Sequence, residues 1–130
     1  MAFLIHSIDG ADVLTWEYLP CSAITPKVGL ALTFSGGNLA VASGSTVPTY
    51  ISMCEKDAPC AAGDIIPVIR VGKNIVFETC AQAALTSVKP GDKLTIYTDG
   101  LQVTATTTSG ICEVVSMEAA AAGSKVLVRF

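Results

Sequence analysis

The stretch that decides the fold reads Leu30-Ala-Leu-Thr-Phe34, then Ser35-Gly-Gly-Asn38, then Leu39-Ala-Val-Ala42: an apolar run, a glycine-rich break and a second apolar run. The same plan recurs at Lys93-Leu-Thr-Ile-Tyr97, Thr98-Asp-Gly100 and Leu101-Gln-Val-Thr104. Gly-Gly and Asp-Gly supply the positive φ angles that tight hairpin turns need. Each stretch therefore predicts a β-hairpin.

Outside the two hairpins, short runs of Val, Ile, Thr and aromatic residues are separated by Gly, Asp, Asn and Pro, a pattern typical of strands. Further strands are predicted at residues 50–55, 64–71, 75–79, 111–117 and 125–130. The helix candidates are short, at residues 79–87 and 119–122. The 130-residue chain is thus predicted to be all-β, with residues 21–130 forming a single small β-barrel or β-sandwich.

An internal repeat relates the two hairpins. Each copy runs through a hairpin, a strand with a Ser-Met pair, an Ala-Ala-Gly bend and an apolar strand carrying one arginine. The copies begin near Gly29 and Gly91 and end with Pro67-Val-Ile-Arg-Val71 and Val126-Leu-Val-Arg-Phe130. We expect two similar β-motifs in a pseudo-twofold arrangement, each burying a face that it could not cover alone.

Residues 1–20 differ from the rest and are predicted to form an extended N-terminal arm that adds a short edge strand. The arm holds Phe3, His6, Tyr18 and Trp16, the single tryptophan of the chain. Because Trp16 and Tyr18 are two positions apart, both rings face the same way in an extended segment. They either anchor in a pocket of a partner protein or fold back onto their own domain.

Composition restricts the function classes. Charged residues make up 15% and hydrophobic residues 51% of a chain with net charge −3, so we expect an oligomer or a chain that works docked on another protein. The basic residues are scattered singly, which disfavours nucleic-acid binding. No apolar run approaches the length of a membrane span, and the N-terminus lacks the pattern of a signal peptide.

The search for chemistry is negative, and we expect neither an enzyme nor a cofactor protein. His6 is the one histidine, so a catalytic triad would have to place its base in the arm. No nucleophile elbow, phosphate-binding loop or dinucleotide fingerprint occurs. Glu55, Asp57 and Asp64 fit a solvated loop better than a calcium site, and no metal is expected.

The five cysteines form no framework and are interpreted as small buried hydrophobic residues. Cys54 and Cys60 lack the spacing of a zinc pair, while a disulfide between them is the alternative left open.

Arg70 and Arg129 lie near the ends of the apolar strands, at equivalent positions of the repeat. Either they extend to water from a strand end, or they are interface arginines, a residue type enriched where proteins meet. The candidate partner-binding residues are Phe3, Trp16, Tyr18, Arg70 and Arg129.

The segments Pro26-Lys-Val-Gly-Leu-Ala-Leu32, Gly36-Gly-Asn-Leu-Ala-Val-Ala-Ser-Gly44, Pro48-Thr-Tyr-Ile51 and Ala62-Gly-Asp-Ile-Ile-Pro-Val-Ile-Arg-Val71 resemble small phage capsid-decoration (cement) proteins encoded by Firmicutes phages and prophages. The resemblance covers most of residues 21–130 and none of residues 1–20. It implies a β-barrel or β-sandwich virion protein, made in the bacterial cytoplasm, that binds the major capsid protein on the outer capsid surface, often as a homotrimer. Such families have no catalytic residues, so none are assigned.

Two alternatives remain open. The chain is either another virion component, such as a head–tail connector, tail or fibre module, or a small carbohydrate- or ligand-binding β-domain. The second alternative predicts exposed aromatic side chains over a groove, whereas aromatic residues make up 6% of this chain.

Overall fold

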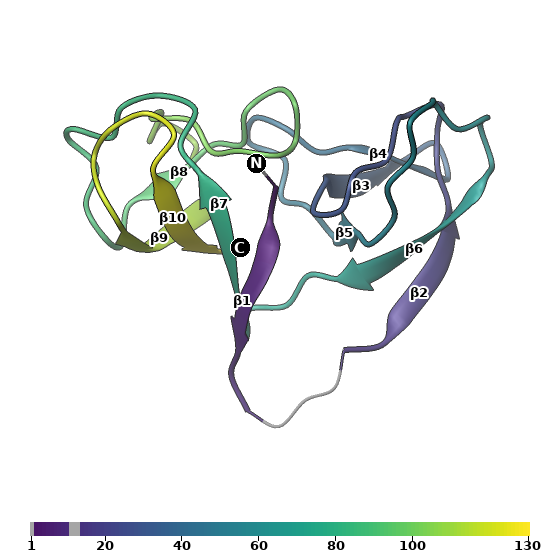
Figure 1. Cartoon of the computed structure of the whole chain (residues 1–130), viewed down its shortest axis with the longest axis horizontal. Helices are drawn as coiled ribbons and strands as arrows, with labels where there is room; N and C mark the ends of the chain where they lie inside the picture. The colour runs from purple at the N-terminus through teal and green to yellow at the C-terminus, as the bar shows by residue number, and fades with distance from the viewer. Residues whose placement is uncertain (1, 11–13) are drawn as a thin grey trace.

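The computed structural model describes residues 2–10 and 14–130 and contains ten strands in two antiparallel five-stranded sheets (Figure 1). The predicted all-β fold is confirmed as a small β-sandwich, and the barrel alternative is not, since the described strands close no barrel. Neither predicted helix candidate is helical; residues 79–87 and 119–122 form strand ends, turns and bends. No helix in the described part of the chain is long and apolar enough to cross a membrane.

The first sheet has the order β2-β6-β5-β3-β4. Its strands are β2 (Trp16–Pro20), β6 (Ile65–Arg70), β5 (Tyr50–Ser52), β3 (Ala31–Ser35) and β4 (Asn38–Val41). The predicted hairpin at residues 30–42 is present as β3 and β4. Gly36 and Gly37 form its turn with φ angles of 61° and 85°, the positive values that made the sequence predict a turn there.

The second sheet has the order β1-β7-β10-β9-β8. Its strands are β1 (Leu4–Ile8), β7 (Ile75–Cys80), β10 (Lys125–Arg129), β9 (Cys112–Met117) and β8 (Lys93–Leu94). The predicted hairpin at residues 93–104 is reduced to β8 and an antiparallel bridge between Ile96 and Val103. Its turn is longer than that of the first hairpin, so fewer backbone bonds close the pair.

The two sheets contain copies of one β-motif, as the repeat predicted. A parallel bridge joins Cys21 to Leu39 in the first motif, and one joins Ala81 to Val103 in the second. The matching backbone hydrogen bonds are Gly63 N to Cys21 O and Gly123 N to Ala81 O, and Gly29 N to Ser52 O and Gly91 N to Val114 O. The copies therefore begin at β2 and β7, earlier than the sequence predicted, and β6 corresponds to β10.

The hydrogen-bonding register corrects two details of the predicted repeat. Ser52 pairs with Val68, and Val114 pairs with Val128, so Ser52 corresponds to Val114 and not to Ser116. The ladder between β9 and β10 shifts at Leu127, which displaces the second Ser-Met pair.

The arginines are also not equivalent. Gly63 and Gly123 make the same backbone hydrogen bond in the two copies and can be used to align β6 with β10. In this alignment Arg70 corresponds to Phe130, and Arg129 corresponds to Ile69. Because side chains alternate across a strand, the two arginines lie on opposite faces of their sheets. The prediction that they are equivalent was wrong.

Within the predicted arm of residues 1–20, the described residues form two edge strands, β1 and β2, one on each sheet. β1 pairs with β7 along the second sheet, and β2 pairs with β6 along the first. Figure 1 shows β1 beside β7 and β2 beside β6.

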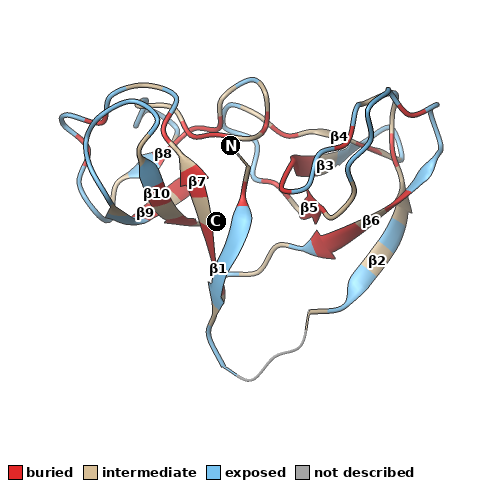
Figure 2. Cartoon of the chain, in the orientation of Figure 1, coloured by how far each residue is buried: buried red, intermediate tan, exposed pale blue. Residues whose placement is uncertain are grey.

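The core is shared between the motifs. One buried cluster takes Ala31, Ile51 and Ile69 from the first sheet together with Phe77, Val126 and other residues of the second. A second cluster lies within the first motif and includes Leu32, Tyr50 and Val68. β3, β5 and β6 therefore bury opposite faces in different clusters, which explains why neighbouring positions of β6, such as Val68 and Ile69, are both apolar. Figure 2 shows the buried segments of β6 and β7 beside the exposed β1 and β2.

Candidate protein-binding surface

Exposed apolar side chains gather on one face of β2 and β6, the same face that carries Ile69 into the shared core. Trp16 is 48%, Tyr18 65% and Ile65 57% exposed. Tyr18 lies directly opposite Pro67, and Pro20 directly opposite Ile65, so their side chains share one face. We call Trp16, Tyr18, Ile65 and Pro67 the aromatic strip.

The sequence prediction that Trp16 and Tyr18 point the same way is confirmed, and a full strand ladder holds both. Ile65 was missed because it opens a continuous apolar run, in which alternation gives no signal for the exposed positions. The signal that could have identified Ile65 as exposed is its position directly after the turn that contains Asp64.

The opposite face of β2 carries a charged cluster that fixes the strand. The Arg70 guanidinium donates from Nε and Nη2 to the Glu17 carboxylate, at 3.2 Å in each case, and from Nη2 to the Tyr50 hydroxyl at 2.8 Å. Its carbon Cζ lies 5.0 Å from the centre of the Tyr50 ring, and Phe34 packs edge-on to that ring at 5.6 Å. The hydrogen bond to Glu17 raises the pKa of Arg70, aided by Tyr50 and the Glu17 charge. Glu17 and Tyr50 were not among the sequence candidates.

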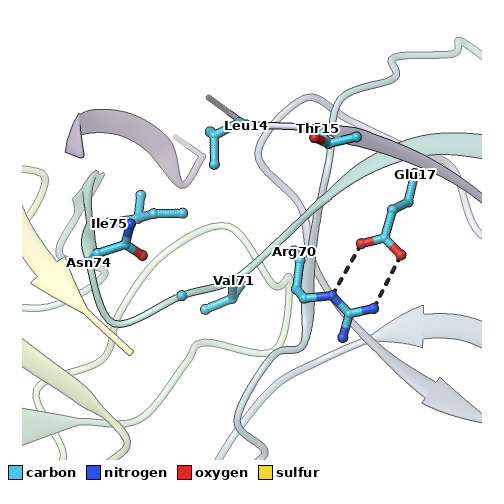
Figure 3. Close-up of a pocket in the computed structure, with 8 residues that line it drawn as sticks. Leu14, Thr15, Glu17, Arg70, Val71, Asn74 and Ile75 are labelled. Atoms are coloured by element: carbon cyan, nitrogen blue, oxygen red, sulfur yellow. Dashed lines mark hydrogen bonds and ion pairs between the residues drawn. The ribbon is translucent and has the colours of Figure 1, made fainter. Parts of the chain in front are cut away.

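A pocket of about 370 Å³ lies beside this cluster (Figure 3). Leu14, Thr15 and Glu17 line one side, and residues 70–72, Asn74 and Ile75 line the other. Glu17 and Arg70 bond to each other within it, so the pocket presents a neutralised ion pair rather than an acid and a base held apart for proton transfer.

Arg129 sits in a different environment from Arg70. Its Nη2 donates to the Asp9 carboxylate at 3.4 Å. The Nε atom is buried and, within the described part of the molecule, has no hydrogen-bond partner. Arg129 and Asp9 tie the residue after β1 to the end of β10, whereas Arg70 and Glu17 tie β6 to β2.

Phe3 is not a surface residue. It is 1% exposed, and its ring centre lies 5.3 Å from that of Phe130, which in turn packs on Phe77. The prediction that Phe3 contacts a partner is replaced by a core position, because β1 pairing with β7 carries Phe3 inward. The exposed His6 follows on the same strand.

All five cysteines are free thiols, and Cys21, Cys60 and Cys112 are buried. Burial, with a hydrogen bond to Cys60, raises the pKa of Cys21 to about 11, and burial also raises the pKa of Cys112. Thiols that stay protonated at neutral pH are poor nucleophiles. The interpretation of these three as small buried residues is confirmed, and Cys54 and Cys60 are not bridged.

Among the described residues, no three His, Cys, Asp or Glu side chains are grouped so that they could hold a metal ion. The arrangement that remains is a rigid strand presenting two exposed rings, an isoleucine and a proline. Such a surface can bind a protein through apolar contacts around aromatic anchors.

Neither a protein-family model nor a curated protein matches the chain.

Proposed function

We propose that this chain is a structural virion protein that decorates and stabilises the outer surface of a phage capsid by bridging capsomers. The observation that carries the proposal is the aromatic strip, which is large, exposed and held on a paired strand. The sequence resemblance to cement proteins supplies the partner, the major capsid protein.

The strip suits docking onto an assembled surface. Trp16 and Tyr18 are held by the β2–β6 ladder and by the Glu17–Arg70 pair beneath it. The backbone of the strip is then already ordered, so binding costs mainly the side-chain entropy of the two rings. Rigid aromatic anchors of this kind carry a large share of the binding energy at protein interfaces.

Stabilisation would follow from mass action. A protein that binds the assembled shell but not free capsomers shifts the equilibrium toward the shell. Since each copy spans neighbouring capsomers, modest interfaces repeated around the particle are sufficient.

The test mixes the purified chain with expanded heads of the phage that encodes it and measures co-sedimentation. Wild-type chain is expected to bind, and Trp16→Ala to weaken binding by about 2 kcal/mol or more, the loss typical of an aromatic anchor. Val47→Ala is the matched control, because Val47 is an exposed apolar residue on the loop before β5, outside the strip.

Binding that is equal for wild type and Trp16→Ala would remove the strip from the capsid contact. Failure of wild type to bind heads would overturn the decoration function. Copy number on purified particles separates decoration, with hundreds of copies, from a connector or tail component, with six or twelve.

A further inference from the structure

We propose that two copies of this chain pair through the outer edges of their β2 strands, forming one continuous antiparallel sheet. The inference rests on the proposed function only in assigning the aromatic strip of the paired chains to the capsid. The pairing itself depends on the backbone of β2.

The backbone N–H and C=O groups of Trp16 and Tyr18 point toward the open edge of β2. Tyr18 lies opposite Pro67, whose carbonyl accepts a hydrogen bond from Met53 N at 3.0 Å on the β5 side. In an antiparallel ladder the N–H and C=O of a residue point to the same side. Tyr18 and Trp16 therefore point their N–H and C=O groups away from β6, toward the open edge.

The second motif shows that an edge of this kind pairs with an antiparallel strand. β7 is the copy of β2, and Val76 and Glu78 are the copies of Trp16 and Tyr18. On β7 these positions pair antiparallel with Ser7 and Leu4 of β1. The same strand geometry is thus covered by an added antiparallel strand in one motif, whereas in the other no strand of the described residues covers it.

The other sheet edges, β1, β4 and β8, are less suited to pairing than β2, and β8 is only two residues long. The ladder of β1 is irregular between Ile5 and Ser7, and bulged edges are poor templates for pairing. On β4, the Leu39 carbonyl already accepts from the Ser22 N–H at 2.8 Å and the Ser22 hydroxyl at 2.9 Å. The same contact joins β4 to Cys21, the residue after β2, so the open part of the β2 edge is the stretch from Trp16 to Tyr18. β2 is regular along its five residues, and its one charged side chain, Glu17, is neutralised by Arg70.

The strand that pairs with this edge is the β2 strand of a second copy. Pro20 has no N–H, so the outward donors of β2 are those of Trp16 and Tyr18. An antiparallel twofold arrangement places Trp16 opposite the partner's Tyr18, and Tyr18 opposite the partner's Trp16. Each such pair exchanges two backbone bonds, which satisfies every outward N–H of both strands. The rings then meet as aromatic cross-strand pairs.

The test uses the purified full-length chain without any capsid. Light scattering after size exclusion is expected to give a mass approaching twice 13.4 kDa as concentration rises. Tyr18→Pro removes the outward N–H without touching the β6 ladder, and proline is tolerated on an open edge, as Pro20 already shows. It should weaken association roughly ten- to a hundredfold. Tyr18→Ala, which keeps the N–H, should weaken association less.

Hydrogen exchange on the wild type gives a second readout that needs no variant. At high concentration the amides of Trp16 and Tyr18 should gain protection, whereas those of Glu17 and Leu19, already bonded to β6, should not change. A monomer at every concentration would overturn the proposal. So would a dimer that survives Tyr18→Pro with no added protection on β2. A dimer that forms but does not bind heads would contradict the proposed capsid function and leave the pairing through β2 intact.

Discussion

At the scale of single residues, Cys21 couples the stability of the chain to pH. It is buried in the first motif, and burial raises the pKa of its thiol from 9.0 to about 11. The folded chain thus keeps this proton at pH values where the unfolded chain has released it. The stabilisation is fully present below pH 9.0 and is lost as pH rises toward about 11.

We predict that the free energy of unfolding, measured by urea titration under reducing conditions, falls between pH 9 and 11 and that Cys21→Ala reduces this slope. Alanine fits the site, because Ala81 occupies the corresponding position in the second motif. The buried Cys112 should leave a residual slope in the variant. An identical slope in both proteins would show that Cys21 does not titrate in this range.

At the scale of elements, β1 is part of the fold and not a detachable arm. It covers the outer edge of β7 and carries Phe3 into the core, where the ring packs on Phe130. Its own surface is nevertheless largely exposed from Leu4 to Ser7. The energetic importance of β1 therefore rests on its ladder and on one buried ring.

We predict that Phe3→Ala lowers the free energy of unfolding by about 3–5 kcal/mol, the usual cost of removing a buried phenylalanine ring. Deleting residues 2–8 should cost more, because it also opens the edge of β7. Urea unfolding measures both, and Leu4→Ala, at a half-exposed position of the same strand, is the control. Unchanged stability on deletion would mean that β1 docks weakly and is free to leave.

At the scale of the whole molecule, the shared core makes the two motifs one cooperative unit. Leu32 points into the cluster of the first motif, while its neighbour Ala31 belongs to the cluster shared with the second. Loosening the second motif therefore removes contacts from the shared cluster, into which the first motif also packs.

We predict that Leu32→Ala and Leu94→Ala, at corresponding positions of the two motifs, each cost about 2–5 kcal/mol and leave a single unfolding transition. Trp16 fluorescence reports on the first sheet and far-UV circular dichroism on the whole backbone, so the two curves should coincide for each variant. Separate midpoints for Leu94→Ala would show that the halves unfold independently.

Local chemistry was enough to predict the strands, the Gly36-Gly37 turn and the duplication. It was not enough to predict the hydrogen-bonding register. The shift at Leu127 displaces the second Ser-Met pair, and the two arginines are seen to be non-equivalent only when the hydrogen bonds align the copies. Phe3 was misplaced for a related reason, since its burial depends on pairing with a strand far along the chain. The exposed rings of Trp16 and Tyr18 were found because alternation on a strand is a local property.

The irregularity between Ile5 and Ser7 in β1 has a consequence for how large an assembly can grow. A subunit with two matching adhesive ends polymerises into a fibre, whereas a subunit with one such end stops at a pair. In the proposed pairing β2 supplies one such end, and the shifted ladder of β1 does not supply a second. Association through strand edges would then stop at two copies instead of continuing into a fibre.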